Sequence, residues 1–124
     1  MSGFESLNVW QTARIFAVEV YRASNQGSFK RDWGLKDQIR RAAVSIASNI
    51  AEGHQRKYRR EFARFLTIAL GSAGEVRTQL YLAQDLGHLP PPEAERLLQC
   101  ARSLSASIDR LRVTVVQQTD SDRP

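Results

Sequence analysis

The sequence predicts one all-α domain spanning residues 1–124, folded as an up-and-down four-helix bundle. Three observations favour this fold. Four segments carry apolar residues at alternating three- and four-residue steps, the spacing of one helix face. Glycine, asparagine and proline separate these segments, and nowhere do apolar and polar residues alternate as in a strand. Apolar residues make up 42% of the 124, which is enough for one packed core.

The first predicted helix covers residues 7–24. Its apolar positions are Leu7, Trp10, Ala13, Ala17, Val20 and Tyr21. Asn8, with Gln11 three positions later, indicates a capping box at the start of this helix. Asn25 and Gly27 then predict its end, because both residue types accept the left-handed conformation that follows many helices.

The second predicted helix covers residues 35–52, after a longer link. Its apolar stripe is Leu35, Ile39, Ala42, Ile46 and Ile50. Gly53 predicts the end of the helix. The link before it carries Phe29 and Trp33, and we expect these aromatic side chains to pack onto the bundle. A contact between Trp33 and a partner is the alternative.

The third and fourth predicted helices cover residues 59–86 and 92–116. Their apolar positions are Phe62, Leu66, Ala69, Ala73, Val76, Leu80 and Ala83, then Ala94, Leu97, Ala101, Leu104, Ile108, Leu111 and Val115. The third stripe has the 3.5-residue spacing of left-handed bundles. Gly71 and Gly74 lie inside it and predict close approach by another helix rather than a phosphate-binding loop. Gly87 and three prolines separate the two helices, and residues 118–124 form a polar tail that we expect to fray.

The positive charge of the chain is concentrated in one region. The whole chain has a net charge of +5, whereas residues 30–64 hold ten basic and four acidic side chains, a net charge of +6. Clustered Lys and Arg neutralise phosphates, and an aromatic ring among them can stack on an unpaired base. The candidate nucleic-acid-binding residues are Lys36, Arg40, Arg56, Lys57, Tyr58, Arg59, Arg60 and Arg64. A solvated basic surface without a ligand is the simpler alternative.

A polar stripe runs along the second helix with the same period as its apolar stripe. We predict that it joins polar residues of the third helix in a buried layer that fixes helix register. The members of this predicted polar layer are Arg41, Ser45, Asn49, Glu52, Ser72 and Glu75. Glu52 and Glu75 facing each other could do acid–base work, but a structural hydrogen-bond network is the favoured interpretation.

The residue inventory does not favour an enzyme, a metal site or a bound cofactor. No nucleophile elbow, phosphate-binding loop or dinucleotide fingerprint occurs in the sequence. Di-iron bundles need two Glu-x-x-His motifs, whereas the chain has two histidines, His54 and His88, and neither has a Glu three residues before it. Asp85 is the only acid at that spacing, before His88. Cys100 is the single cysteine, so neither an internal disulfide nor a zinc site is expected. We interpret it as a small residue in or beside the core.

One string in the second segment is highly specific. Residues 38–53 read Gln-Ile-Arg-Arg-Ala-Ala-Val-Ser-Ile-Ala-Ser-Asn-Ile-Ala-Glu-Gly, and Arg56, Glu61, Phe62, Phe65, Leu66, Ala69, Gly71, Ser72 and Glu75 follow. With Leu7, Trp10 and Tyr21, this pattern resembles the four helix bundle protein family. That family includes proteins encoded by intervening sequences in bacterial 23S rRNA genes, and accessory variability proteins of diversity-generating retroelements. The resemblance extends over residues 7–115.

The resemblance implies a four-helix bundle that assembles into a ring-like homopentamer. In the retroelement branch it also implies a basic surface that binds nucleic acid and a partner reverse transcriptase. Two positions depart from the family pattern. Tyr58 replaces a serine that caps the third helix, and Arg77 replaces an acid two residues after Glu75. The first departure predicts a different cap or a helix start shifted a few residues toward His54. The second reverses a charge that a partner or neighbouring subunit would meet.

The sequence therefore favours a non-catalytic, basic, oligomeric adaptor for RNA or DNA, with a reverse transcriptase as a further partner. The alternative is a structural or protein-interaction bundle without a nucleic-acid role. No apolar run approaches the roughly 20 residues that cross a bilayer, and the first residues lack the features of a secretory signal. We accordingly expect a cytoplasmic protein that does not enter membranes.

Overall fold

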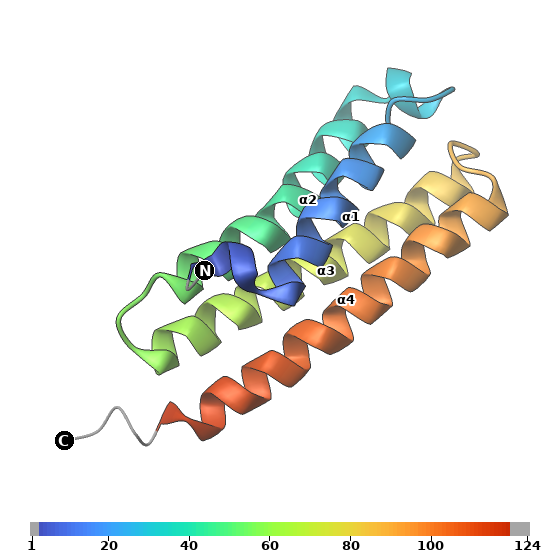
Figure 1. Ribbon diagram of the computed structural model, residues 1–124. Helices are drawn as coiled ribbons and strands as arrows, with labels where there is room; N and C mark the ends of the chain where they lie inside the picture. Colours follow the sequence, from blue (N-terminus) through green and yellow to red (C-terminus); the bar gives the residue numbers. More distant parts are fainter. Residues whose placement is uncertain (1–2, 120–124) are drawn as a thin grey trace.

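A computed structural model describes residues 3–119 and confirms the four-helix bundle (Figure 1). Its helices are α1 (Asn8–Ala23), α2 (Trp33–His54), α3 (Arg59–Asp85) and α4 (Pro91–Gln117). Two short 3-10 turns, η1 (Phe4–Ser6) and η2 (Phe29–Arg31), precede α1 and α2. No strand occurs within residues 3–119. The predicted tail begins after α4, and its residues 120–124 lie outside the described part of the chain.

The helices run up and down in chain order. Short links join α2 to α3 and α3 to α4, so each pair packs antiparallel. α1 packs mainly on α2 and also contacts α4, which closes the bundle (Figure 1). With 16 residues, α1 is shorter than α2, and α3 and α4 have 27 residues each.

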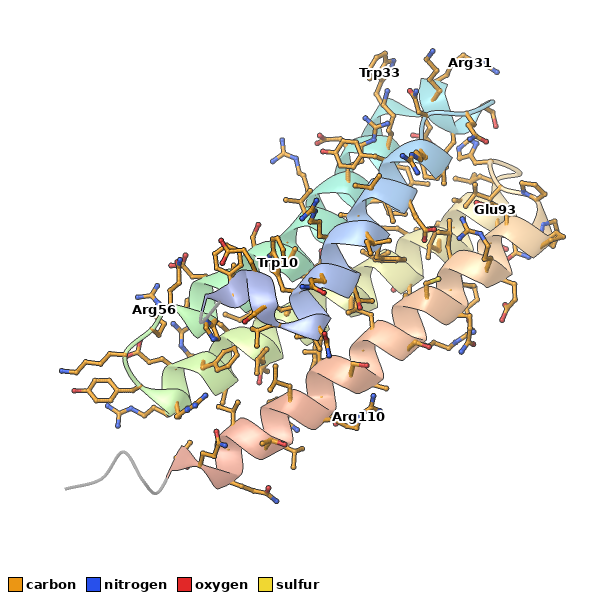
Figure 2. The ribbon with its side chains drawn as sticks, in the orientation of Figure 1. Trp10, Arg31, Trp33, Arg56, Glu93 and Arg110 are labelled. Atoms are coloured by element: carbon orange, nitrogen blue, oxygen red, sulfur yellow. The ribbon has the colours of Figure 1, made fainter. Side chains whose placement is uncertain are left out.

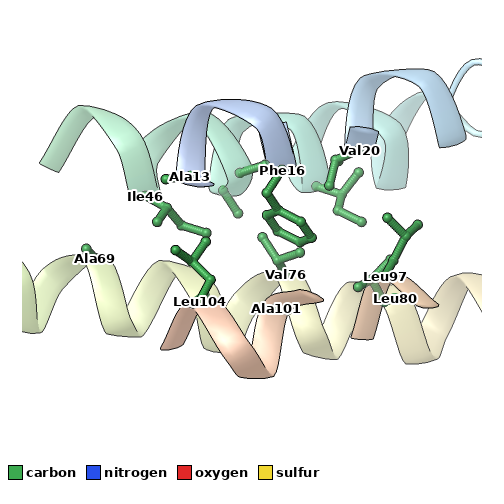
Figure 3. Close-up of a cluster of buried hydrophobic side chains, with 14 of the residues drawn as sticks. Ala13, Phe16, Val20, Ile46, Ala69, Val76, Leu80, Leu97, Ala101 and Leu104 are labelled. Carbon is green, nitrogen blue, oxygen red and sulfur yellow. The ribbon is translucent and has the colours of Figure 1, made fainter. Parts of the chain in front are cut away.

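The predicted apolar stripes of α2, α3 and α4 supply most of the core. All seven predicted positions of α3 are buried. Between the helices, Ile46 lies next to Leu104 and Leu80 lies beside Leu97 (Figure 3). α1 differs from the prediction. Phe16 fills the centre of its buried face, whereas Tyr21, assigned to that face, exposes 43% of its surface. Cys100 is partly buried against the core, as expected.

The beginnings of α1 and α2 differ from the sequence prediction. α2 begins at Trp33 because Asp32 acts as its N-cap, its Oδ1 accepting a hydrogen bond from the Leu35 amide at 3.1 Å. The capping box predicted for α1 is wrong. Asn8 is already helical, and Gln11 Nε2 donates to the Glu5 carbonyl at 2.8 Å instead.

Glycines have different roles from those predicted. Gly53 does not end α2, which continues to His54. A Cβ at Gly53 would come within 2.6 Å of Phe65 Cβ, so this glycine is required by helix packing. The close approach predicted at Gly71 and Gly74 is absent within the subunit. Nothing lies within 4 Å of a Cβ at Gly71, and only the Arg77 guanidinium, at 3.9 Å, approaches one at Gly74.

Side chains join the link between α1 and α2 to the link between α3 and α4. His88, which follows α3, contacts Ser28 and Asp32 through its ring nitrogens. Its Nδ1 lies 2.7 Å from Ser28 Oγ, and its Nε2 lies 2.9 Å from Asp32 Oδ2. The buried Phe29 ring stacks on the imidazole with a centroid distance of 5.3 Å. Phe29 therefore packs onto the bundle as predicted, whereas Trp33 exposes 74% of its surface.

Candidate nucleic-acid interface

Six of the predicted binding residues gather where α2 turns into α3. We call Arg56, Lys57, Tyr58, Arg59, Arg60 and Arg64 the basic cluster. Gln55 ends α2 in a helical conformation, and Tyr58 then adopts an extended one, with φ −110° and ψ 141°, before α3 begins. The tight link concentrates the cations at one end of the bundle, where Arg56 projects from the surface (Figure 2).

Aromatic rings organise the cations of the basic cluster. Lys57 Nζ lies 5.4 Å from the Tyr58 ring centroid, and Arg60 Cζ lies 5.1 Å from it. Arg56 and Arg64 place their guanidinium carbons 4.9 and 4.7 Å from the centroid of the Phe65 ring. Cations over aromatic faces are attracted by the ring quadrupole. Four of the five cations of the cluster therefore lie beside one of two aromatic rings.

The first turn of α3 adds to the positive potential of the basic cluster. Tyr58 is the N-cap residue of α3 but makes no side-chain capping bond, so the structure shows no different side-chain cap at this position. The amide groups of a helix N-terminus favour an anion. A pocket of about 250 Å³ lies here, lined by His54, Arg56, Lys57, Tyr58, Arg59 and Phe62. Glu52, which pairs with Arg56 at 2.7 Å, and Glu61 are the nearby acids in sequence.

Lys36 and Arg40 are not brought to the basic cluster. Lys36 precedes Arg56 by five to six helical turns, about 30 Å along the helix axis. Lys36 is buried, donates to the Lys30 carbonyl at 3.1 Å and lies 3.8 Å from the Trp33 ring centroid. Arg40 donates to Ser24 Oγ at 2.8 Å and to the Tyr21 carbonyl at 3.2 Å. In the folded chain both cations hold α2 to neighbouring segments.

The predicted polar layer is brought together only in part. Ser45 Oγ and Ser72 Oγ lie 2.9 Å apart across α2 and α3, and Asn49 Nδ2 donates to Ser45 Oγ at 2.9 Å. The three charged members, Arg41, Glu52 and Glu75, are exposed instead.

The charged residues of the predicted layer form no ion pair with one another within residues 3–119. Arg41 pairs with Asp37 at 2.8 Å within α2, and Glu52 pairs with Arg56, which follows the end of α2. Because α2 and α3 run antiparallel, Glu52 and Glu75 lie in opposite directions from the serine pair. They do not form the facing carboxylate pair considered for acid–base chemistry.

The hydrogen-bonded group of Ser28, Asp32 and His88 was not found from the sequence. Ser28 and His88 are 60 residues apart, and no local pattern links them. The hydrogen bond to His88, and next the one from the Leu35 amide, hold the pKa of Asp32 below its ordinary 3.8. No group of three or more His, Cys, Asp or Glu side chains within residues 3–119 is arranged to hold a metal ion. The helices in that range include none long and apolar enough to span a membrane.

The fold and the basic cluster define a small four-helix-bundle protein with a cationic end. Comparison with known protein families identifies the family of this chain. The chain belongs to the 23S rRNA-intervening sequence protein family, whose model matches residues 5–110.

A solved structure supports the fold independently. The chain is similar to a protein from Bacteroides thetaiotaomicron described as having unknown function and belonging to the S23 ribosomal protein family. The match has a TM-score of 0.77 and 23% identity, and it covers 84% of this chain and 97% of the other. No curated protein matches the chain.

Proposed function

We propose that this protein is a non-catalytic adaptor that binds nucleic acid through the basic cluster. The observation that carries the proposal is a set of four cations beside Tyr58 and Phe65, with Arg59 next to them in sequence, at the start of α3, where no side chain caps the helix. Lys and Arg release counterions when they neutralise phosphates, which gives affinity without sequence readout. The Tyr58 ring lines the pocket, and its proposed role is to stack on an unpaired base.

Oligomerisation would multiply these contacts. The family resemblance implies a homopentamer, in which the basic cluster is repeated once per subunit. Repeated weak sites on one assembly raise the overall affinity because later contacts form within the same complex. The same resemblance supports a reverse transcriptase as protein partner. A reverse-transcriptase gene beside a variable repeat, next to the gene for this chain, would favour that partner. Placement inside a 23S rRNA gene would favour the other branch.

The test is a fluorescence-polarisation titration with single- and double-stranded RNA and DNA at several salt concentrations. The test variant changes Lys57, Arg59 and Arg60 to serine. The matched control removes three arginines from other parts of the surface, Arg31, Arg77 and Arg110. Each phosphate contact contributes about −0.9 to the slope of log affinity against log salt for duplex DNA, and about −0.7 for single strands.

We expect the test variant to lose most of the affinity for nucleic acid. The slope of log affinity against log salt should become shallower by about two to three, for duplex and for single-stranded oligonucleotides. The control should change both much less. A triple variant of the basic cluster that binds as well as its control would contradict the proposal, as would a wild-type protein that binds no oligonucleotide at low salt.

One observation favours a second candidate function, protein interaction. An open groove of about 920 Å³ lies between α1 and α2, and much of its lining is apolar. Trp10, Ala17, Val18, Val44 and Ala47 are among the residues that form it. Capture of a specific protein by the wild type, lost in a Val44→Glu variant that keeps its subunit assembly, would support this function.

A further inference from the structure

A second hollow lies between α2 and α3, away from the basic cluster. It has a volume of about 530 Å³, and we call it the polar groove. Its polar lining residues are Gln38, Arg41, Ser45, Ser72, Glu75 and Gln79. It contains the serine pair of the predicted polar layer, but it is open to solvent where that layer was expected to be closed.

Gln79 is the feature of the polar groove that folding alone does not explain. Its side chain is more than nine-tenths buried, with 8% of the surface exposed. Its Oε1 atom has no hydrogen-bond partner among residues 3–119. A buried carbonyl oxygen without a donor loses its hydration and gains nothing in return. An apolar residue at this position would avoid that cost, so Gln79 points to a donor supplied from outside the subunit.

The surroundings of Gln79 indicate the chemistry of that donor. Glu75 lies one helical turn before Gln79 on α3, lines the same groove and forms no ion pair within the described part of the chain. Ser72, about one turn before Glu75 on α3, contributes a hydroxyl group to the groove. The one cation of the lining, Arg41, is turned toward Asp37 at 2.8 Å. Glu75 and Gln79 thus bring a carboxylate and an amide side chain, one helical turn apart on α3, to the same groove.

We propose that the polar groove binds a guanidinium group, with Glu75 and Gln79 as its acceptors. A guanidinium is planar and carries five donors in a fixed arrangement, so it can reach a carboxylate and a neighbouring carbonyl together. An ammonium group is a compact, strongly hydrated point charge and fits this pair less well. An arginine of a second copy is one source, since fifteen of the eighteen basic residues of the chain are arginine. A separate guanidinium compound is the other.

The first measurement uses N-acetyl-arginine methylamide as the probe, with N-acetyl-lysine methylamide as the control. Binding to the wild type, Glu75→Gln and Gln79→Met is followed by NMR chemical-shift titration and the subunit assembly by sedimentation. We expect the arginine probe to bind the wild type at least tenfold more tightly than the lysine probe, and each variant to lose at least tenfold. Loss of assembly in both variants would instead identify the arginine of a second copy as the occupant. Equal binding of the two probes, or no binding together with unchanged assembly in both variants, overturns the proposal.

Thermal unfolding without probe provides an independent measurement. Methionine has nearly the shape of glutamine without its polar atoms, so Gln79→Met should raise the Tm of the dissociated subunit. A lower Tm would mean that the carbonyl is already satisfied, which overturns the proposal. An Arg41→Ala variant tests whether the chain's own Arg41 guanidinium fills the groove. If Arg41→Ala and Glu75→Gln lower the Tm equally and non-additively, Arg41 fills the groove and the proposal fails.

Discussion

Gly53 lies where α2 meets the first turns of α3. A Cβ on this residue would stand 2.6 Å from Phe65 Cβ, 3.1 Å from Phe62 Cδ1 and 3.3 Å from the Phe62 carbonyl. Two of these atoms are fixed closely to the α3 backbone, so rotation of a side chain does not relieve the contact. The absence of a side chain at Gly53 thereby sets how closely α2 and α3 approach beside the basic cluster.

We predict opposite effects for two glycine-to-alanine substitutions. Gly53→Ala should lower the free energy of unfolding by about 1–2 kcal/mol, because overpacking outweighs the gain in helix propensity. Gly71→Ala, in open space on α3, should raise it by about 0.5–1 kcal/mol. Urea unfolding of both variants checks this pair. A stabilised Gly53→Ala would show that the helices separate easily at this point.

Asp32 gives the stability of the protein a dependence on acid pH. Its pKa is lowered mainly by the hydrogen bond to His88, so the folded state favours the ionised carboxylate. The resulting stabilisation is present above the ordinary pKa of 3.8 and is lost as the pH falls through the lower, folded-state value. We predict that wild type is more stable than Asp32→Asn at pH 7 and that this difference shrinks toward zero near pH 2. Denaturant unfolding at several pH values measures it, and a constant difference would exclude the ionised Asp32 as its source.

Individual residues of the candidate site could be predicted from the sequence only where the chain itself keeps them together. The run from Arg56 to Arg64 is local, so the basic cluster followed from composition. Lys36 and Arg40 share its charge but lie several helical turns away, and charge counting carries no information about that distance. The Ser45–Ser72 contact followed from helical spacing, whereas the orphaned oxygen of Gln79 depends on packing between two helices.

At the scale of elements, Arg40 closes the end of α1. Its guanidinium donates to the Tyr21 carbonyl and to Ser24 Oγ, and its Cζ lies 4.4 Å from the Tyr21 ring centroid. The last carbonyls of a helix have no partner within the helix. A cation that binds them from α2 therefore fastens the end of α1 to its neighbour.

We predict that Arg40→Gln lowers the free energy of unfolding by about 1–2 kcal/mol, through lost charge-assisted hydrogen bonds. The affinity for nucleic acid and its salt slope should stay unchanged. Calorimetry and the polarisation titration measure the two properties separately. A steep loss of affinity for nucleic acid with unchanged stability would instead show that Arg40 belongs to the binding surface.

Helix type and order could be predicted from the sequence, but several boundaries could not. The seven-residue recurrence in α3 is long enough to fix its type and its buried face. α2 begins earlier than its apolar stripe because Asp32, outside that stripe, caps it. The buried face of α1 was misplaced because Trp10 and Tyr21 are apolar at the expected spacing, whereas Phe16 is the residue that enters the core.

At the scale of the whole molecule, the α1–α2 groove bears on assembly. Val18 and Val44 line it with 44% and 42% of their surfaces exposed. Exposed Ile15 lies on the same helix as Val18, at 62%. Contiguous apolar surface of this kind marks interaction sites on proteins.

We predict that the wild type sediments as a multimer of its 14.0 kDa subunit, with five copies favoured by the family resemblance. Val18→Glu should dissociate it, because a charge would be buried without a partner. Val116→Glu, at a comparable exposure of 45% near the end of α4, is the matched control and should leave the assembly intact. Multimers that persist in Val18→Glu would show that the subunit interface does not include this groove. A wild type that is monomeric at micromolar concentration would show that no such interface forms.

The small share of α1 in the core has a consequence for motion. α1 contributes four buried residues, whereas α3 contributes eleven. Segments with little buried surface open at a lower free energy than the rest of a fold. Transient release of α1 would uncover the core from one side while α2, α3 and α4 stay packed. Amide hydrogens of α1 should then exchange with solvent through a partial opening, before and independently of those in α3, and subunit assembly should slow that exchange.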